Sequence, residues 1–138
     1  MKPVIIYASM TGHSKKIALE ISEKLGIKAY NIKDNPKIDG YEMGIIVSGI
    51  YGGQCKEELI EFAKGLTPQN IKSALLVTSS MKEVSPNKLI ETLSLKDIDV
   101  IKDEYKCKGS FLVMGMSHPN KDEITRAVAF VKKALENA

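Results

Sequence analysis

Near the start of the chain, the apolar run Val4–Ala8 (VIIYA) leads directly into the polar segment Ser9–Ser14 (SMTGHS). A continuous apolar run of this length predicts a strand that is buried on both faces of a sheet. From His13 to Leu25, apolar residues recur at every fourth position, and Gly26 follows as a helix stop. The segment therefore predicts a buried strand, a short polar loop and a helix, in that order.

The same alternation of strands and helices continues to the end of the chain. Apolar runs predict strands at Ile27–Ile32, Met43–Ser48 and Ala74–Thr78, and a weaker fifth strand or a pair of short strands within Ile98–Cys107. Helical spacing predicts helices at Lys56–Leu66 and Ser85–Leu93, and a last helix after Asn120 with the apolar stripe Ile124, Ala127, Val128, Val131 and Leu135. Alternating strands and helices form right-handed crossovers, so we expect one α/β domain over residues 1–138, with a parallel sheet between two helical layers.

The composition is that of a soluble globular protein, with 43% hydrophobic and 27% charged residues. Every apolar run is shorter than the roughly 20 residues of a membrane span, and the N-terminal run does not resemble a signal peptide. Cys55 and Cys107 are too far apart in the sequence to suggest a disulfide framework or a metal-binding pair. We therefore expect a cytoplasmic protein without a membrane span or a metal site.

The net charge of +3 comes almost entirely from lysines, because Arg126 is the only arginine. The lysines are scattered among acidic residues, and no basic run with interleaved aromatic residues is present, so we expect no nucleic acid partner. A mild positive charge favours an anionic ligand or an acidic partner.

The polar loop after the first strand has the properties of an anion site. In open parallel sheets the ligand binds outside the carboxyl ends of the strands, and a helix that starts there attracts negative charge. The hydroxyls of Ser9, Thr11 and Ser14 can donate to a phosphate, and Gly12 lets the backbone approach it. The same residues suit a plain N-cap equally well. A Walker loop, a dinucleotide G-x-G-x-x-G loop, a Cys–Arg phosphatase loop and the paired acids of a receiver domain are all absent.

Taken together, these segments resemble flavodoxins. Ser9-x-Thr11-Gly12-x-Ser14 is similar to the FMN phosphate loop of that family, [ST]-x-T-G-x-[ST], with His13 where a small polar residue is more common. The phrase from Ile38 to Gly53 resembles the second block of the family. The C-terminal end of a small flavodoxin-like subgroup is similar to Cys107-Lys108-Gly109 followed by Gly115-x-x-His118-Pro119-Asn120-x-x-Glu123. The resemblance implies a doubly wound, five-stranded parallel sheet of order 2-1-3-4-5.

The resemblance also implies an FMN site built from three loops. The phosphate loop would comprise Ser9, Met10, Thr11, Gly12, His13 and Ser14; the second loop Ser48, Gly49, Ile50, Tyr51, Gly52 and Gly53; and the third Thr78, Ser79, Ser80 and Met81. Tyr51 can stack on a flavin ring, and Gly52 or Gly53 can supply a peptide flip that would stabilise a half-reduced flavin. The third loop offers Met81 where many flavodoxins have an aromatic residue.

Three functions fit this sequence. The first is an electron carrier with FMN that exchanges electrons with redox partner proteins, as a monomer or a weak homodimer. The second is an FMN-dependent reductase of NAD(P)H and a quinone or another small molecule, which needs an open flavin face. The third is a flavin-free scaffold on the same fold. Because no catalytic acid or base is evident, we expect the carrier.

Overall fold

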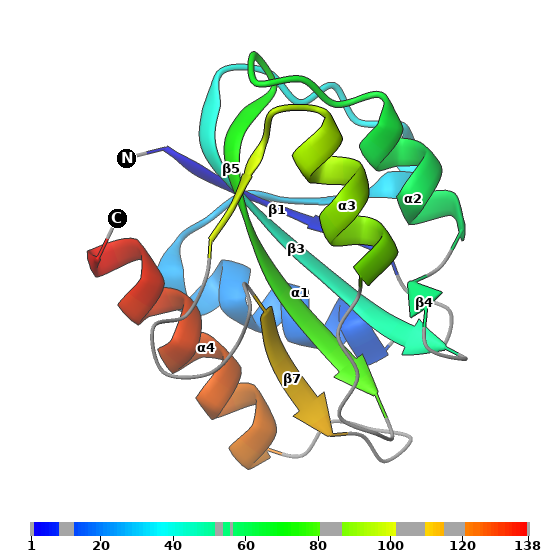
Figure 1. Cartoon of the computed structure of the whole chain (residues 1–138). Coiled ribbons are helices and arrows are strands. Elements are labelled where there is room, and N and C mark those ends of the chain that lie inside the picture. The colour runs from blue at the N-terminus through cyan, green and yellow to red at the C-terminus, as the bar shows by residue number, and fades with distance from the viewer. Residues whose placement is uncertain are drawn as a thin grey trace.

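A parallel sheet forms the middle layer of the molecule (Figure 1). The computed structural model describes residues 2–8, 13–51, 54–55, 57–80, 87–101, 110–114 and 121–137. The sheet contains β1 (Pro3–Tyr7), β2 (Ala29–Asn31), β3 (Tyr41–Tyr51), β5 (Ile71–Ser80), β6 (Asp99–Val100) and β7 (Ser110–Met114). Its order is β2-β1-β3-β5-β6, which confirms the expected order 2-1-3-4-5 of five parallel strand positions.

Two short strands share the fifth position. β6 pairs with the first half of β5 through Ser73↔Asp99 and Ala74↔Val100. β7 pairs with the second half, from Leu76↔Ser110 to Ser80↔Met114. The expectation of a fifth strand within Ile98–Cys107 is therefore correct for β6 and wrong for β7, which begins three residues later.

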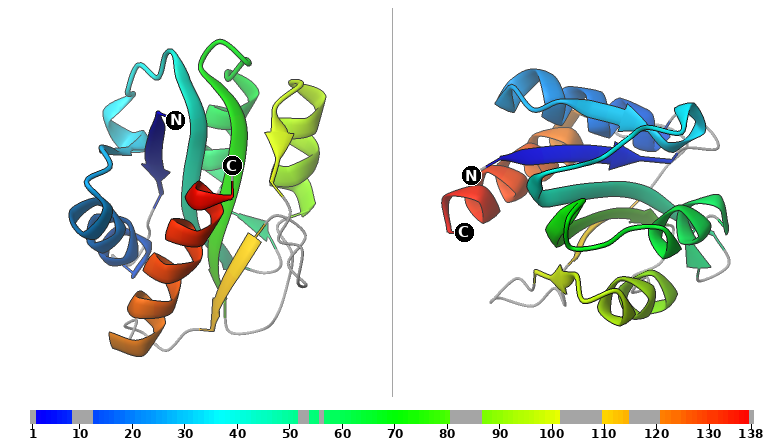
Figure 2. Two further views of the ribbon diagram at one scale, coloured as in Figure 1. Left: turned by 90° about the vertical axis from the view of Figure 1, so that its left-hand side faces the viewer. Right: turned by 90° about the horizontal axis from the view of Figure 1, so that it is seen from above.

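Two pairs of helices cover the two faces of the sheet (Figure 2). α1 (His13–Leu25) and α4 (Lys121–Glu136) lie on one face, and α2 (Glu57–Lys64) and α3 (Asn87–Leu95) lie on the other. Strand side chains alternate between the faces, so Ile5 packs with α1 and α4 whereas Val4 and Ile6 pack on the side of α2 and α3. The sheet is thus buried on both faces, which explains the continuous apolar runs of its strands.

Helix packing follows the predicted apolar stripes. Ile17 and Ile21 of α1 and Ala127 and Val131 of α4 are buried in one core cluster. The second core cluster, on the opposite face of the sheet, contains Leu59, Ile60 and Ala63 of α2 and Leu89 and Leu93 of α3. α2 starts one residue later and ends two residues earlier than predicted, and α3 is shifted by two residues toward the C-terminus. Ser85, Pro86 and Asn120, expected near helix starts, lie outside the described residues.

The predicted strand at Ile27–Ile32 is shorter in the structure because a turn interrupts it. β2 ends at Asn31, whose side chain accepts a hydrogen bond of 3.1 Å from the amide of Lys33 and caps the 3-10 helix η1 (Ile32–Asp34). Asn35 then adopts a left-handed conformation with φ of 50°. By contrast, β3 and β5 extend beyond the predicted Met43–Ser48 and Ala74–Thr78 at both ends.

Candidate functional site

The carboxyl ends of β1, β3 and β5 meet at one edge of the sheet, because the three strands are parallel neighbours. Beyond the end of β1, the amide of Ala8 still donates a hydrogen bond of 3.1 Å to the carbonyl of Val47. α1 begins at the same edge and packs against β1 and β3. This carboxyl edge is where ligands bind in doubly wound folds.

Ser14, the second residue of α1, has a buried hydroxyl without a partner in the described part of the chain. Its side chain is 0% exposed, and its Oγ makes no hydrogen bond to any described residue. Leaving a buried hydroxyl unsatisfied costs about 1–3 kcal/mol. The backbone amides of a first helical turn also lack partners within the helix and attract an anion. An anion at the start of α1 would satisfy both the hydroxyl and the helix.

Ser48 and Thr78 bring two further buried hydroxyls to the same edge. They are paired in the register of β3 and β5, and each is 1% exposed. The Ser48 hydroxyl donates to the carbonyl of Gly49 at 3.0 Å. By strand alternation both side chains lie on the face of α2 and α3.

A family model described as the flavodoxin domain matches residues 4–123. The chain belongs to the flavodoxin family. An uncharacterised protein of Methanocaldococcus jannaschii is 30% identical to this flavodoxin domain over 151 aligned positions, which cover 99% of this chain and all of the relative.

Two solved structures have a similar fold. Oxidised flavodoxin 2 from Bacillus cereus has a TM-score of 0.67 at 15% identity, with all of both chains covered. The rubredoxin:oxygen oxidoreductase of Desulfovibrio gigas has a TM-score of 0.69 at 18% identity and covers 99% of this chain, which spans 36% of that larger protein. At these identities the likeness shows the fold alone.

The family implies a flavin cofactor, and the described residues at the carboxyl edge suit an anionic group of such a cofactor. The hydroxyl of Ser14, which has no partner among the residues that the structure describes, is a hydrogen-bond donor at a helix start, which is what a bound phosphate requires. Within the described ranges, no three His, Cys, Asp or Glu residues gather where a metal ion could bind, and no helix is long and apolar enough to cross a membrane.

The other predicted residues of the flavodoxin phosphate loop are only partly described. Ser9, Met10, Thr11 and Gly12 lie outside the described residues, and His13 is the first residue of α1. In the third loop, Ser79 and Ser80 are the last residues of β5, so the strand continues where a loop was expected. Met81 lies outside the described residues.

The second predicted loop is partly a hairpin. β3 continues through Ile50 to Tyr51 and pairs with the antiparallel strand β4 (Gln54–Cys55) through Ile50↔Cys55 and Tyr51↔Gln54. The expectation that β3 ends at Ser48 is therefore wrong. Gly52 and Gly53, which connect the two strands, lie outside the described residues. A Gly-Gly pair at this place is a favourable hairpin sequence.

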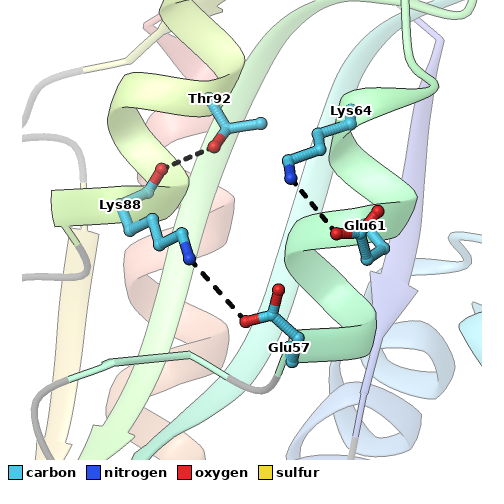
Figure 3. A network of polar contacts seen from close by, with 5 residues as sticks. All are labelled: Glu57, Glu61, Lys64, Lys88 and Thr92. Carbon is cyan, nitrogen blue, oxygen red and sulfur yellow. Dashed lines mark hydrogen bonds and ion pairs between the residues drawn. The ribbon is translucent and has the colours of Figure 1, made fainter.

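An ion pair that the sequence did not indicate joins the helices of one face. Lys88 Nζ lies 3.7 Å from Glu57 Oε2, so the first turn of α3 contacts the first turn of α2 (Figure 3). Both helices start at the carboxyl edge, directly after the second and third predicted loops. Glu57 and Lys88 are far apart in the sequence, and only the fold brings them together.

The shifted pKa values among the described residues belong to a tyrosine–lysine cluster elsewhere on the sheet. A hydrogen bond from Lys28 lowers the pKa of Tyr30 and raises that of Lys28. Burial, together with a hydrogen bond to Tyr30, raises the pKa of Tyr41. Lys2 Nζ lies 4.9 Å from the centre of the Tyr41 ring. Tyr41 begins β3 and Lys2 precedes β1, so this cluster lies toward the amino edge, away from the candidate flavin site.

Proposed function

We propose that this protein binds FMN at the carboxyl edge and carries electrons between redox partner proteins. The observation that supports the proposal is the Ser14 hydroxyl, which is fully buried at the start of α1 without a hydrogen-bond partner among the described residues. A phosphate oxygen is the ligand that would satisfy it and the helix start together.

Each proposed loop has a separate task. The first loop would hold the phosphate through hydroxyls and backbone amides, and it comprises Ser9, Met10, Thr11, Gly12, His13 and Ser14. The other two loops would surround the flavin ring. They comprise Ser48, Gly49, Ile50, Tyr51, Gly52 and Gly53 in the second loop, and Thr78, Ser79, Ser80 and Met81 in the third. FMN supplies reversible acceptance of one or two electrons when it is bound. Tyr51 would stack against the ring and exclude water from it.

The buried position of Gly49 supports the proposal that the second loop lies beside the flavin ring. β3 brings Gly49 to the carboxyl edge beside Ser79 of β5, and no side chain projects from it there. Beyond it, β3 continues to Tyr51 and pairs with β4, which lies beside the end of β3 (Figure 1). A hairpin in this position can cover one face of a ring whose phosphate lies at the start of α1.

We also propose that residues 1–138 act as one flavodoxin-like domain in the cytoplasm, as a monomer or a weak homodimer. Cys55 and Cys107 are far apart in the sequence, and two free thiols would be compatible with a reducing compartment.

Binding titrations with FMN and riboflavin test the proposal. Wild-type protein should bind FMN more tightly than riboflavin, because riboflavin lacks the phosphate. Ser14→Ala should weaken FMN binding by about 1.5–3 kcal/mol, the range for a hydrogen bond to a charged group, and leave riboflavin binding unchanged. Ser94→Ala, which removes an exposed hydroxyl from α3, is the matched control. Equal affinity for FMN and riboflavin would contradict the phosphate site.

Stepwise reduction of the FMN-loaded protein separates the carrier from a reductase. A carrier should take up its two electrons in two resolved one-electron steps and should oxidise NADH and NADPH slowly. A single two-electron step with rapid NAD(P)H oxidation would instead indicate a reductase.

A further inference from the structure

The first turn of α1 presents two exposed lysines beside the buried Ser14. Lys15 and Lys16 are exposed, and the turn contains no acidic residue. Neither lysine forms an ion pair with a described residue. A cation at a helix N-terminus opposes the helix dipole, so these lysines do not stabilise α1. Their position therefore points to a role outside the fold.

An exposed leucine completes this surface. Leu19 is 44% exposed and follows Lys15 by four positions and Lys16 by three, so the three side chains lie on neighbouring positions of the solvent face of α1. We refer to Lys15, Lys16 and Leu19 as the α1 patch. An apolar centre next to charged groups is the usual arrangement of a protein docking surface.

Among the described residues of the carboxyl edge, the α1 patch is the cationic part. α2 begins with Glu57 and Glu58, and the cation of Lys88 at the start of α3 lies 3.7 Å from Glu57. α4 begins with Lys121-Asp122-Glu123, which is of mixed charge. A negatively charged partner that approaches this edge is therefore attracted most strongly to α1.

We propose that the α1 patch docks an electron-transfer protein whose redox centre is surrounded by acidic residues. The inference rests on the proposed function, because the patch lies next to the hydroxyl assigned to the FMN phosphate. Complementary charge raises association rates by 10- to 1,000-fold at low salt, and the net charge of +3 acts in the same direction. In the docked complex one electron leaves the reduced flavin and one oxidised centre of the partner is reduced, for example Fe(III) to Fe(II).

Two haem proteins of opposite charge test the proposal. FMN-loaded protein, reduced with dithionite, is mixed in a stopped-flow instrument with the acidic soluble domain of cytochrome b5 or with basic cytochrome c, and haem reduction is followed by absorbance. Ionic strength is varied from about 0.01 M to about 0.15 M, which shortens the screening length from about 30 Å to about 8 Å. The rate constant with cytochrome b5 should fall about tenfold or more over this range, and that with cytochrome c should not fall.

A matched pair of variants tests the location. Lys15→Glu with Lys16→Glu should slow cytochrome b5 reduction about tenfold at low salt and abolish its fall with salt. Lys24→Glu with Lys72→Glu is the control, because Lys24 lies in the last turn of α1 and Lys72 is the second residue of β5, both at the amino edge, and both are exposed. Each replacement changes the charge by −2, so both double variants have a net charge of −1 instead of +3. The control should keep the wild-type rate within about twofold.

The outcomes separate this inference from the proposed function. A protein that binds no FMN contradicts the proposed function itself. A protein that binds FMN but shows equal rates in the two double variants contradicts docking at the α1 patch, because net charge then explains the effect. If Lys15→Glu with Lys16→Glu weakens FMN binding yet leaves the rates of the FMN-saturated protein unchanged, the lysines attract FMN and the docking proposal is wrong.

Discussion

Ser48 and Thr78 lie opposite each other in the register of β3 and β5, and both hydroxyl side chains are buried near the carboxyl edge. Buried polar side chains are uncommon in parallel strands, which are usually apolar on both faces. The pair therefore marks the point where the sheet changes from core to candidate flavin site.

Replacing Ser48 with Ala should weaken FMN binding about 3- to 10-fold, which corresponds to the loss of about one hydrogen bond. Ser73→Ala is the control. The Ser73 hydroxyl also donates to a backbone carbonyl, that of Glu42, at 2.9 Å, but it lies near the amino edge, away from the candidate site. Both variants should lose about 0.5–1.5 kcal/mol of unfolding free energy in urea titrations. If Ser73→Ala weakens FMN binding as much as Ser48→Ala does, the effect is one of stability.

Gly44 of β3 packs directly against Ile71 of β5. A Cβ added to Gly44 would lie 2.7 Å from Cδ1 of Ile71 and 3.2 Å from its Cγ2. Gly44→Ala should therefore destabilise the protein by about 1–3 kcal/mol, the usual cost of overpacking a core. Urea unfolding monitored by circular dichroism measures this change.

The double variant Gly44→Ala with Ile71→Val should recover part of that loss, because Ile71→Val removes Cδ1, the atom in the closest contact. Ile71→Val alone should cost about 0.5–1.5 kcal/mol. A coupling free energy of at least about 0.5 kcal/mol in the double-mutant cycle is expected for residues in contact. Strict additivity would show that the steric conflict is relieved elsewhere.

The strands and the helical faces could be predicted because they depend on apolar patterning, which is strong in Val4–Ala8 and in α4, whereas the strand order came from the resemblance to flavodoxins. It could not predict the ends of β3 and β5, since Tyr41 and the polar Ser80 become strand residues by pairing with Ile71 and Met114. The apolar residues of β7 are typical of a strand. That β6 and β7 both pair with β5 is a tertiary arrangement, which local sequence patterns do not reveal.

The candidate site was less predictable than the fold. A serine at a helix start suits an N-cap or a phosphate site equally, and only the complete burial of Ser14, with no partner for its hydroxyl among the described residues, separates the two. The hairpin of β3 and β4 and the contact of Glu57 with Lys88 depend on pairings between chain segments, which local sequence patterns do not reveal.

Lys28→Met should raise the pKa of Tyr30 toward about 10, the value of an unperturbed tyrosine. The ammonium of Lys28 donates a hydrogen bond to Tyr30 and thereby favours its tyrosinate, so removing it favours the protonated form. Ultraviolet titration of tyrosinate, with Tyr30→Phe to assign the signal, measures the shift. Lys33→Met, which removes an exposed lysine nearby in the sequence, should leave the titration unchanged.

Ser14→Ala should stabilise the FMN-free protein, or leave it unchanged, while it weakens FMN binding. Removing a buried hydroxyl that has no partner among the described residues abolishes its desolvation cost of about 1–3 kcal/mol, and the small cavity left by one oxygen offsets part of that gain. With FMN bound, the same hydroxyl would donate to the phosphate, so its loss should lower the Tm of the FMN-saturated protein. Thermal unfolding with and without excess FMN therefore gives changes of opposite sign. A loss of stability in the FMN-free protein would mean that the hydroxyl has a partner within the chain, and the phosphate assignment would lose its support.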